Sequence, residues 1–156
     1  MNKPISFYYK LSALFGFLVL LLSFLPSKEQ SALSFVGIII EVLGAVVLAI
    51  AGRSAKIQNI KPIKVGATMG LIYGVLASIS VFFKTITRAQ MLQQLKALHS
   101  NAPTPKGAIT NALHTANSPI VHLVSFVVAV VVAVLIGVII TAIAGAATRV
   151  EDSNTI

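Results

Sequence analysis

The sequence contains no cysteine, and only four of its 156 residues are acidic. Without cysteine the chain forms no disulfide, offers no thiolate to a metal ion and has no cysteine nucleophile. Charged residues make up only 10% of the chain, which is too few to cover the surface of a water-soluble domain of this length. The scarcity of charge therefore excludes an ordinary soluble globular protein and indicates a chain that lies mainly in lipid.

What the sequence does contain is four long apolar blocks, at residues 11–26, 33–52, 65–83 and 119–147. A helix needs about 20 apolar residues to cross a bilayer, and lipid permits only helices or closed barrels as spanning structures. The first block has the basic start of a signal peptide, but no cleavage site of small residues follows it, so we expect a retained span. We predict an all-α integral membrane protein in which residues 1–156 form one domain, a four-transmembrane-helix bundle.

The connections between the blocks differ in kind. Residues 27–32 are predicted to form a tight turn, and residues 53–64 carry four positive charges and no negative charge. The third connection, residues 84–118, is long enough to have structure of its own. In its first half apolar side chains recur at helical spacing opposite a row of glutamines, which predicts an amphipathic helix that extends the third span. The apolar positions are Met91, Leu92, Leu95 and Leu98.

Two further helix starts are marked by a hydroxyl residue followed by proline. Thr104 and Pro105 predict a second short helix in the long connection, which runs through Ile109, Leu113 and Ala116. Ser118 and Pro119 repeat the signal at the start of the fourth span.

The basic residues predict the orientation of the chain in the membrane. With four spans, seven of them fall on one side (Lys3, Lys10, Arg53, Lys56, Lys61, Lys64 and Arg149) and five on the other (Lys28, Lys84, Arg88, Lys96 and Lys106). The contrast is sharper in the short loops, which hold four and one. We therefore predict a plasma membrane protein with both termini cytoplasmic and the loop 84–118 outside. The net charge of +8 then reflects topology and contact with anionic headgroups, and nucleic acid is not a predicted partner.

Small residues recur every four positions in three of the spans. Residues four apart share one face of a helix, and small side chains there let two backbones approach closely in lipid. The pattern predicts tight packing of spans two, three and four. The packing residues are Gly37 and Ala45 in span two, Gly66, Gly70 and Gly74 in span three, and Ala129, Ala133 and Gly137 in span four.

Glu41 is the one charged residue inside an apolar block. A carboxylate that faces lipid would cost several kcal/mol, so we expect Glu41 to face the bundle, on the same side of its helix as Gly37 and Ala45. It lies eight residues into its span, about 12 Å deep. The candidate partners at or near this depth are Tyr73, Ser78, Ser125 and His122.

Two interpretations of Glu41 remain open. In the first, a neutral carboxyl joins neighbouring helices by hydrogen bonds and has a structural role. In the second, Glu41 is a proton or cation site, as an ionisable group within a membrane suggests. The lack of a second acidic residue in the spans favours the structural role.

The residue pattern does not indicate an enzyme, a metal site or a cofactor site. A nucleophile needs a base and an orienting group, and the only titratable candidates in the apolar blocks are His122 and Glu41, at different depths. His99 and His114 lie in the long loop, which has no acidic residue to help bind a metal. The glycines fall at helical spacing and form no phosphate-binding loop.

These patterns predict a small non-enzymatic protein that works by helix–helix contact, as an accessory, assembly or protective (immunity-like) subunit. Its predicted partners are the lipid bilayer and either another membrane protein or further copies of itself. The alternative is a small transporter or channel-forming oligomer that uses Glu41 as a proton or cation site.

Overall fold

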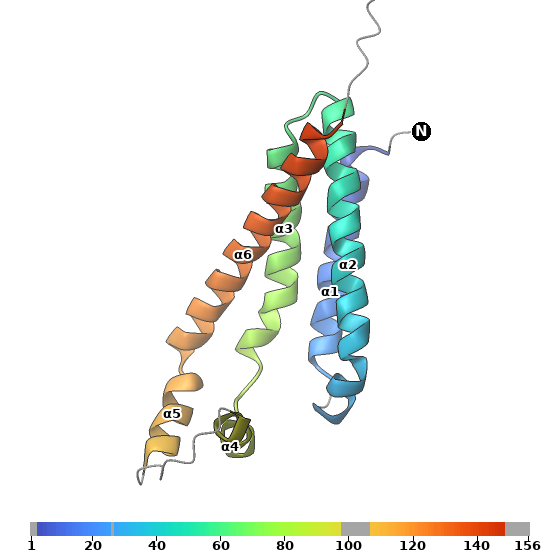
Figure 1. Cartoon of the computed structure of the whole chain (residues 1–156). Helices are drawn as coiled ribbons and strands as arrows, with labels where there is room; N and C mark the ends of the chain where they lie inside the picture. The colour runs from blue at the N-terminus through green and yellow to red at the C-terminus, as the bar shows by residue number, and fades with distance from the viewer. Residues whose placement is uncertain (1–2, 26, 98–106, 149–156) are drawn as a thin grey trace, which may run out of the picture.

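The computed structural model describes residues 3–25, 27–97 and 107–148, with only the backbone described at 27–34 and 93–97. Four long apolar helices pack together: α1 (Ile5–Ser23), α2 (Ser27–Ile57), α3 (Pro62–Ser78) and α6 (Pro119–Ala146). A 3-10 turn, η1 (Ile79–Phe82), continues α3, and two short helices, α4 (Arg88–Ala97) and α5 (Ala108–Ala116), lie between α3 and α6. Each long helix, counting η1 with α3, is long and apolar enough to cross a membrane. The predicted fold class is confirmed (Figure 1).

The first two connections are shorter in the structure than in the prediction, because α2 continues past both ends of its apolar block. α2 begins at Ser27, so the predicted turn at 27–32 is wrong and the link from α1 occupies only residues 24–26. α2 also continues past Gly52 to Ile57. Lysine, glutamate, glutamine and alanine are good helix formers, so a change to polar sequence marks the edge of the membrane and not the end of a helix.

The link between α2 and α3 is closed by local hydrogen bonds. Asn59 has a φ of 58°, a left-handed conformation that asparagine tolerates better than most residues. The backbone N–H of Ile60 donates to the carbonyl oxygen of Ala55 at 2.8 Å. Pro62 then occupies the first turn of α3, where its missing N–H is not needed.

The helix predicted in the first half of the long connection is present as α4, and Leu98 lies outside the described residues. The helix does not extend the third span as predicted, because residues 84–87 are not helical. The Asn117 side chain makes two hydrogen bonds to the backbone of Ile86, accepting from its N–H at 2.7 Å and donating to its carbonyl at 2.9 Å. α4 then starts anew: the N–H of Thr87 donates to Gln90 Oε1 at 2.9 Å, and the N–H of Gln90 donates to Thr87 Oγ1 at 3.4 Å. This reciprocal pair is a capping box.

The remaining helix starts agree with their signals where the structure describes them. Ser118 caps α6 by accepting a hydrogen bond from the N–H of Val121 at 3.3 Å, and Pro119 follows in the first turn, as predicted. α5 begins after Gly107, whose φ is 89°. The predicted start at Thr104 and Pro105 lies outside the described residues.

α3 is the central helix of the bundle, because its contacts with α1, α2 and α6 are together more extensive than those of any other helix. Its contact with α6 is the most extensive, and glycine makes it possible. A Cβ at Gly66 would collide with Thr141 Oγ1 and the backbone of Gly137, and one at Gly70 would lie 2.5 Å from the carbonyl oxygen of Ala133. On the other side α1 packs through a buried face of Ile5, Tyr8, Ser12 and Gly16.

The bundle has two distinct ends (Figure 1). The start of α1, the link between α2 and α3 and the end of α6 lie at one end, which we call the turn end. The link between α1 and α2 and the helices α4 and α5 lie at the other, which we call the loop end. Exposed basic side chains gather at the turn end. They are Lys3, Arg53, Lys56, Lys61 and Lys64.

Candidate functional site: a groove between α2 and α6

α2 and α6 touch near the turn end and separate toward the loop end. At the contact a Cβ on Gly52 would lie 2.5 Å from the carbonyl oxygen of Thr141, and Thr141 is fully buried. From this contact toward the loop end, α6 leans away from α2, as Figure 1 shows. Small residues at the crossing and larger separation below it leave a wedge-shaped space with α3 behind it.

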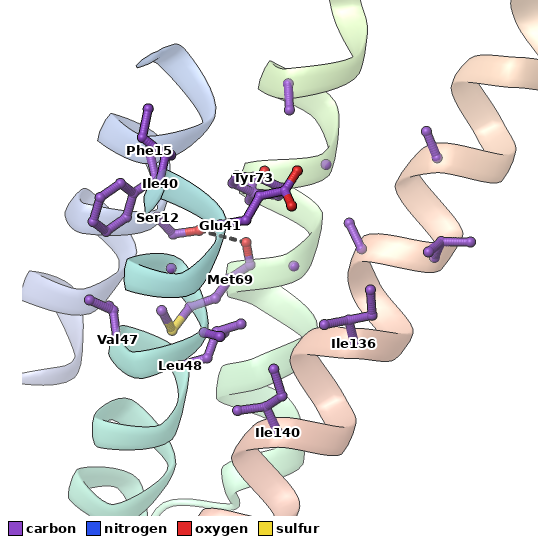
Figure 2. Close-up of a pocket in the computed structure, with 18 of the residues that line it drawn as sticks. Ser12, Phe15, Ile40, Glu41, Val47, Leu48, Met69, Tyr73, Ile136 and Ile140 are labelled. Atoms are coloured by element: carbon purple, nitrogen blue, oxygen red, sulfur yellow. Dashed lines mark hydrogen bonds between the residues drawn. The ribbon is translucent and has the colours of Figure 1, made fainter. Parts of the chain in front are cut away.

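This space is a groove of about 420 Å³ that is open on one side. All four long helices contribute to its lining, and most of the lining is apolar (Figure 2). The lining residues are Ser12 and Phe15 from α1; Ile40, Glu41, Gly44, Ala45, Val47 and Leu48 from α2; Met69, Gly70, Tyr73, Gly74, Ala77 and Ser78 from α3; and Ala129, Val132, Ala133, Ile136 and Ile140 from α6.

Glu41 lies in this groove and is exposed. Figure 2 shows its carboxyl group directed away from α2, on the side where α3 and α6 lie. It makes no hydrogen bond or ion pair with another described residue, although it lies close enough to Tyr73 to interact electrostatically. The structural role predicted for Glu41, hydrogen bonds that join the helices, is therefore absent from the described part of the chain.

The other polar side chains of the groove differ from Glu41 in their bonding. Ser12 is buried and donates to the carbonyl oxygen of Met69 at 2.7 Å, which ties α1 to α3. Ser78 makes no hydrogen bond with another described residue. Tyr73 contributes an aromatic ring and a phenol group. The groove thus offers a carboxyl group, a phenol and a hydroxyl within an apolar lining.

The structure brings some of the predicted site residues together and separates others. Tyr73 and Ser78 line the groove with Glu41, whereas Ser125 and His122 do not. Both of these lie near the start of α6, where it has moved away from α2. Ser125 is exposed and His122 is half-buried.

The predicted packing residues also divide into groups. Gly66 and Gly137 meet in the contact between α3 and α6. Gly70 and Gly74 also pack against α6, and they line the groove together with Ala45, Ala129 and Ala133. Gly37 packs against nothing, because a Cβ there would meet no described atom within 4 Å.

Sequence reasoning missed several residues that shape the site. Ser12 and Gly16 are four apart on α1, and a Cβ on Gly16 would lie 3.1 Å from the carbonyl oxygen of Tyr73. That spacing is the same small-residue signal found in the other spans, and it could have been read in the first span. Gly44 and Gly52 fall outside the four-residue series of span two, so only the path of α6 reveals their surroundings.

The described residues contain no group of three histidine, cysteine, aspartate or glutamate side chains that could hold a metal ion. The lining of the groove has a single carboxyl group. Such a set of groups is suited to holding a hydrogen-bond donor or a cation in an apolar environment.

The fold and the groove define the chain as a small multi-pass helical membrane protein. No protein-family model matches it, and comparison with curated proteins and with solved structures gives no match.

Proposed function

We propose that this protein is a non-enzymatic accessory, assembly or protective subunit of a plasma membrane, and that it acts by helix–helix contact through the groove between α2 and α6. The partner is a transmembrane helix that covers the groove. The observation that carries the proposal is the open groove itself, in which Glu41 has neither a hydrogen bond nor an ion pair with a described residue.

Two properties of the groove support this function. Its walls include Gly44, Ala45, Ala129 and Ala133, and small residues of this kind let a further helix approach closely in lipid. An acidic group left in an apolar groove is costly, and an additional helix that pairs with it would remove that cost. Polar residues within spans usually face a bundle interior or a water-filled cavity, and a partner would give Glu41 such a position.

The proposal includes an orientation with both termini in the cytoplasm. Its support is the excess of basic residues in the link between α2 and α3. In this orientation the turn end is cytoplasmic, and α4 and α5 lie outside.

Site-directed photo-crosslinking in the native membrane tests the contact. A photoreactive residue at Gly44, which lines the groove and has open space beside it, should give one adduct of defined mass. The matched control is Val46 of the same helix, which is 49% exposed but does not line the groove. Adducts of equal yield at both positions, or none at Gly44, would show that the groove is not a contact site.

The second candidate function is proton or cation transport by an oligomer that uses Glu41, and the exposed carboxyl in the groove favours it. Glu41→Gln separates the two candidates, because glutamine keeps the shape of the side chain but cannot ionise. With no hydrogen bond to lose within the described residues, the variant should fold and insert as the native protein does. A pH-dependent ion flux into proteoliposomes that is present in the native protein and absent in Glu41→Gln would establish transport.

A further inference from the structure

The groove has a chemical feature besides its shape, because its one acidic group has no hydrogen bond or ion pair with a described residue. We propose that the helix that docks in the groove belongs to a different protein and brings a lysine or arginine side chain to Glu41. This inference rests on the proposed contact function and specifies the chemistry of the partner.

The charge of the chain itself points to a different protein. None of the apolar blocks contains lysine or arginine, Glu41 is their only acidic residue, and His122, their only histidine, lies outside the groove near the start of α6. The nearest basic residue along α2, Arg53, is twelve positions away, about 18 Å along the helix axis. A second copy of this chain therefore presents no cation at the depth of Glu41, and two groove faces brought together would place two acidic groups side by side.

The contact of Gly52 with Thr141 closes the groove toward the turn end. A docked helix therefore lies on the loop-end side of this contact, where Glu41 lines the groove. A basic residue of the partner at the depth of Glu41 determines the pairing.

The lining suits a long basic side chain. Ile136 and Ile140 of α6 point toward the groove in Figure 2 and offer apolar surface to the methylene groups of lysine or arginine. The ring of Tyr73 adds a π face near Glu41, and a cation beside both groups gains from each. A partner with only apolar side chains would leave the carboxyl group without compensation.

Model helices in vesicles test this pairing without knowledge of the natural partner. The full-length protein carries a donor dye on a single cysteine at Ile60, which is exposed in the link between α2 and α3, since the native chain has no cysteine. The probes are acceptor-labelled leucine–alanine transmembrane peptides with one central residue, either lysine, glutamine or leucine. Energy transfer measures their binding to the protein in the bilayer.

We expect the lysine peptide to bind roughly tenfold more tightly than the leucine peptide. The preference should vanish in Glu41→Gln. Gly44→Leu adds a large side chain to the groove at a position where a Cβ meets nothing within 4 Å, and it should weaken binding of the lysine peptide. Val46→Phe on the opposite face of α2 should not.

Three results would overturn the inference: equal binding of the lysine and leucine peptides, equal binding of the lysine and glutamine peptides, or a lysine preference that persists in Glu41→Gln. Energy transfer between two copies of the protein that is lost in Gly44→Leu would also overturn it, because the groove would then bind a second copy. If Gly44 gives its crosslink in native membranes while the lysine preference is absent, the contact function stands and only the charge pairing fails.

Discussion

At the scale of single residues, the polar side chains of the spans fall into two groups. Ser12 and Thr141 are buried and donate to backbone carbonyl oxygens, Ser12 to a neighbouring helix and Thr141 to Gly137 of its own helix at 2.8 Å. Glu41 is exposed and has no such bond with a described residue. The first group therefore stabilises the bundle, whereas Glu41 is free to interact with another molecule.

The hydrogen bond of Ser12 leads to a stability prediction. Ser12→Ala removes the hydroxyl that donates to the carbonyl oxygen of Met69, and the expected loss in the free energy of unfolding is about 1 kcal/mol. Thermal unfolding in mild detergent measures the effect. Ser6→Ala on the same helix is the control, since Ser6 is exposed and should tolerate the change. Equal stability of the two variants would show that the Ser12 bond contributes nothing.

At the scale of helices, the contact between α3 and α6 is built from backbone surfaces that glycine leaves bare. Gly66, Gly70 and Gly137 lie where a methyl group would meet the backbone or a buried hydroxyl group of the facing helix. Gly37 belongs to the same kind of small-residue series in the sequence but has open space beside it. Only the relative position of the helices shows which glycines allow a close contact and which could carry a side chain.

This difference is testable with one methyl group at each site. Gly66→Ala should destabilise the bundle by about 1–3 kcal/mol, because the new methyl group collides with Thr141 Oγ1 and the Gly137 carbonyl. Gly37→Ala should leave stability unchanged or raise it slightly, since alanine is the better helix former. Unfolding midpoints in detergent compare the two variants, and the packing described for α3 and α6 fails if they shift by the same amount.

The connection between α3 and α4 is held by hydrogen bonds from the side chain of Asn117. Asn117→Ala removes both hydrogen bonds to Ile86, so the amide of Ile86 should exchange its hydrogen faster by roughly tenfold or more. Asn111→Ala in α5 is the control, because that side chain is exposed and makes no hydrogen bond with a described residue. Hydrogen exchange followed by mass spectrometry measures the exchange rate of residues 84–87 in both variants. Unchanged exchange at residues 84–87 would mean that another contact holds this segment.

At the scale of the whole molecule, the bundle is closed at the turn end and open along one side. α3 contacts each of the other three long helices, and α2 meets α6 closely at Gly52 and Thr141, on the turn-end side of the groove. Exposed apolar side chains cover the outer faces of α2 and α6, as expected for helices in lipid. Among the side chains that the structure describes, Glu41 in the opening between them is the only acidic group on this apolar surface.

The proposed orientation leads to a prediction for the whole chain. Ile60, in the link between α2 and α3, and Asn111, in α5, are both exposed and lie at opposite ends of the bundle. Each can be replaced by a single cysteine. With both termini cytoplasmic, a membrane-impermeant thiol reagent should label Asn111→Cys in intact cells and Ile60→Cys only after the cells are opened. The reverse pattern would invert the topology.

The sequence alone determined the class of protein, the number of spans and the start of α6. Apolar blocks of this length cross lipid as helices, so these properties follow from composition and length. The cap at Ser118 is equally local, because its bond to the N–H of Val121 spans three residues. The limits of α2 were less predictable, since helices formed by polar residues continue beyond the membrane.

Only the tertiary structure decided which polar and small residues act together. Tyr73 and Ser78 share the groove with Glu41, whereas Ser125 and His122 do not, because α6 leans away from α2 below the contact of Gly52 with Thr141. The crossing of two helices depends on every contact along them, and no four-residue period in one helix specifies it. For the same reason the sequence placed Glu41 on the inner side of its helix but could not show that this side is open.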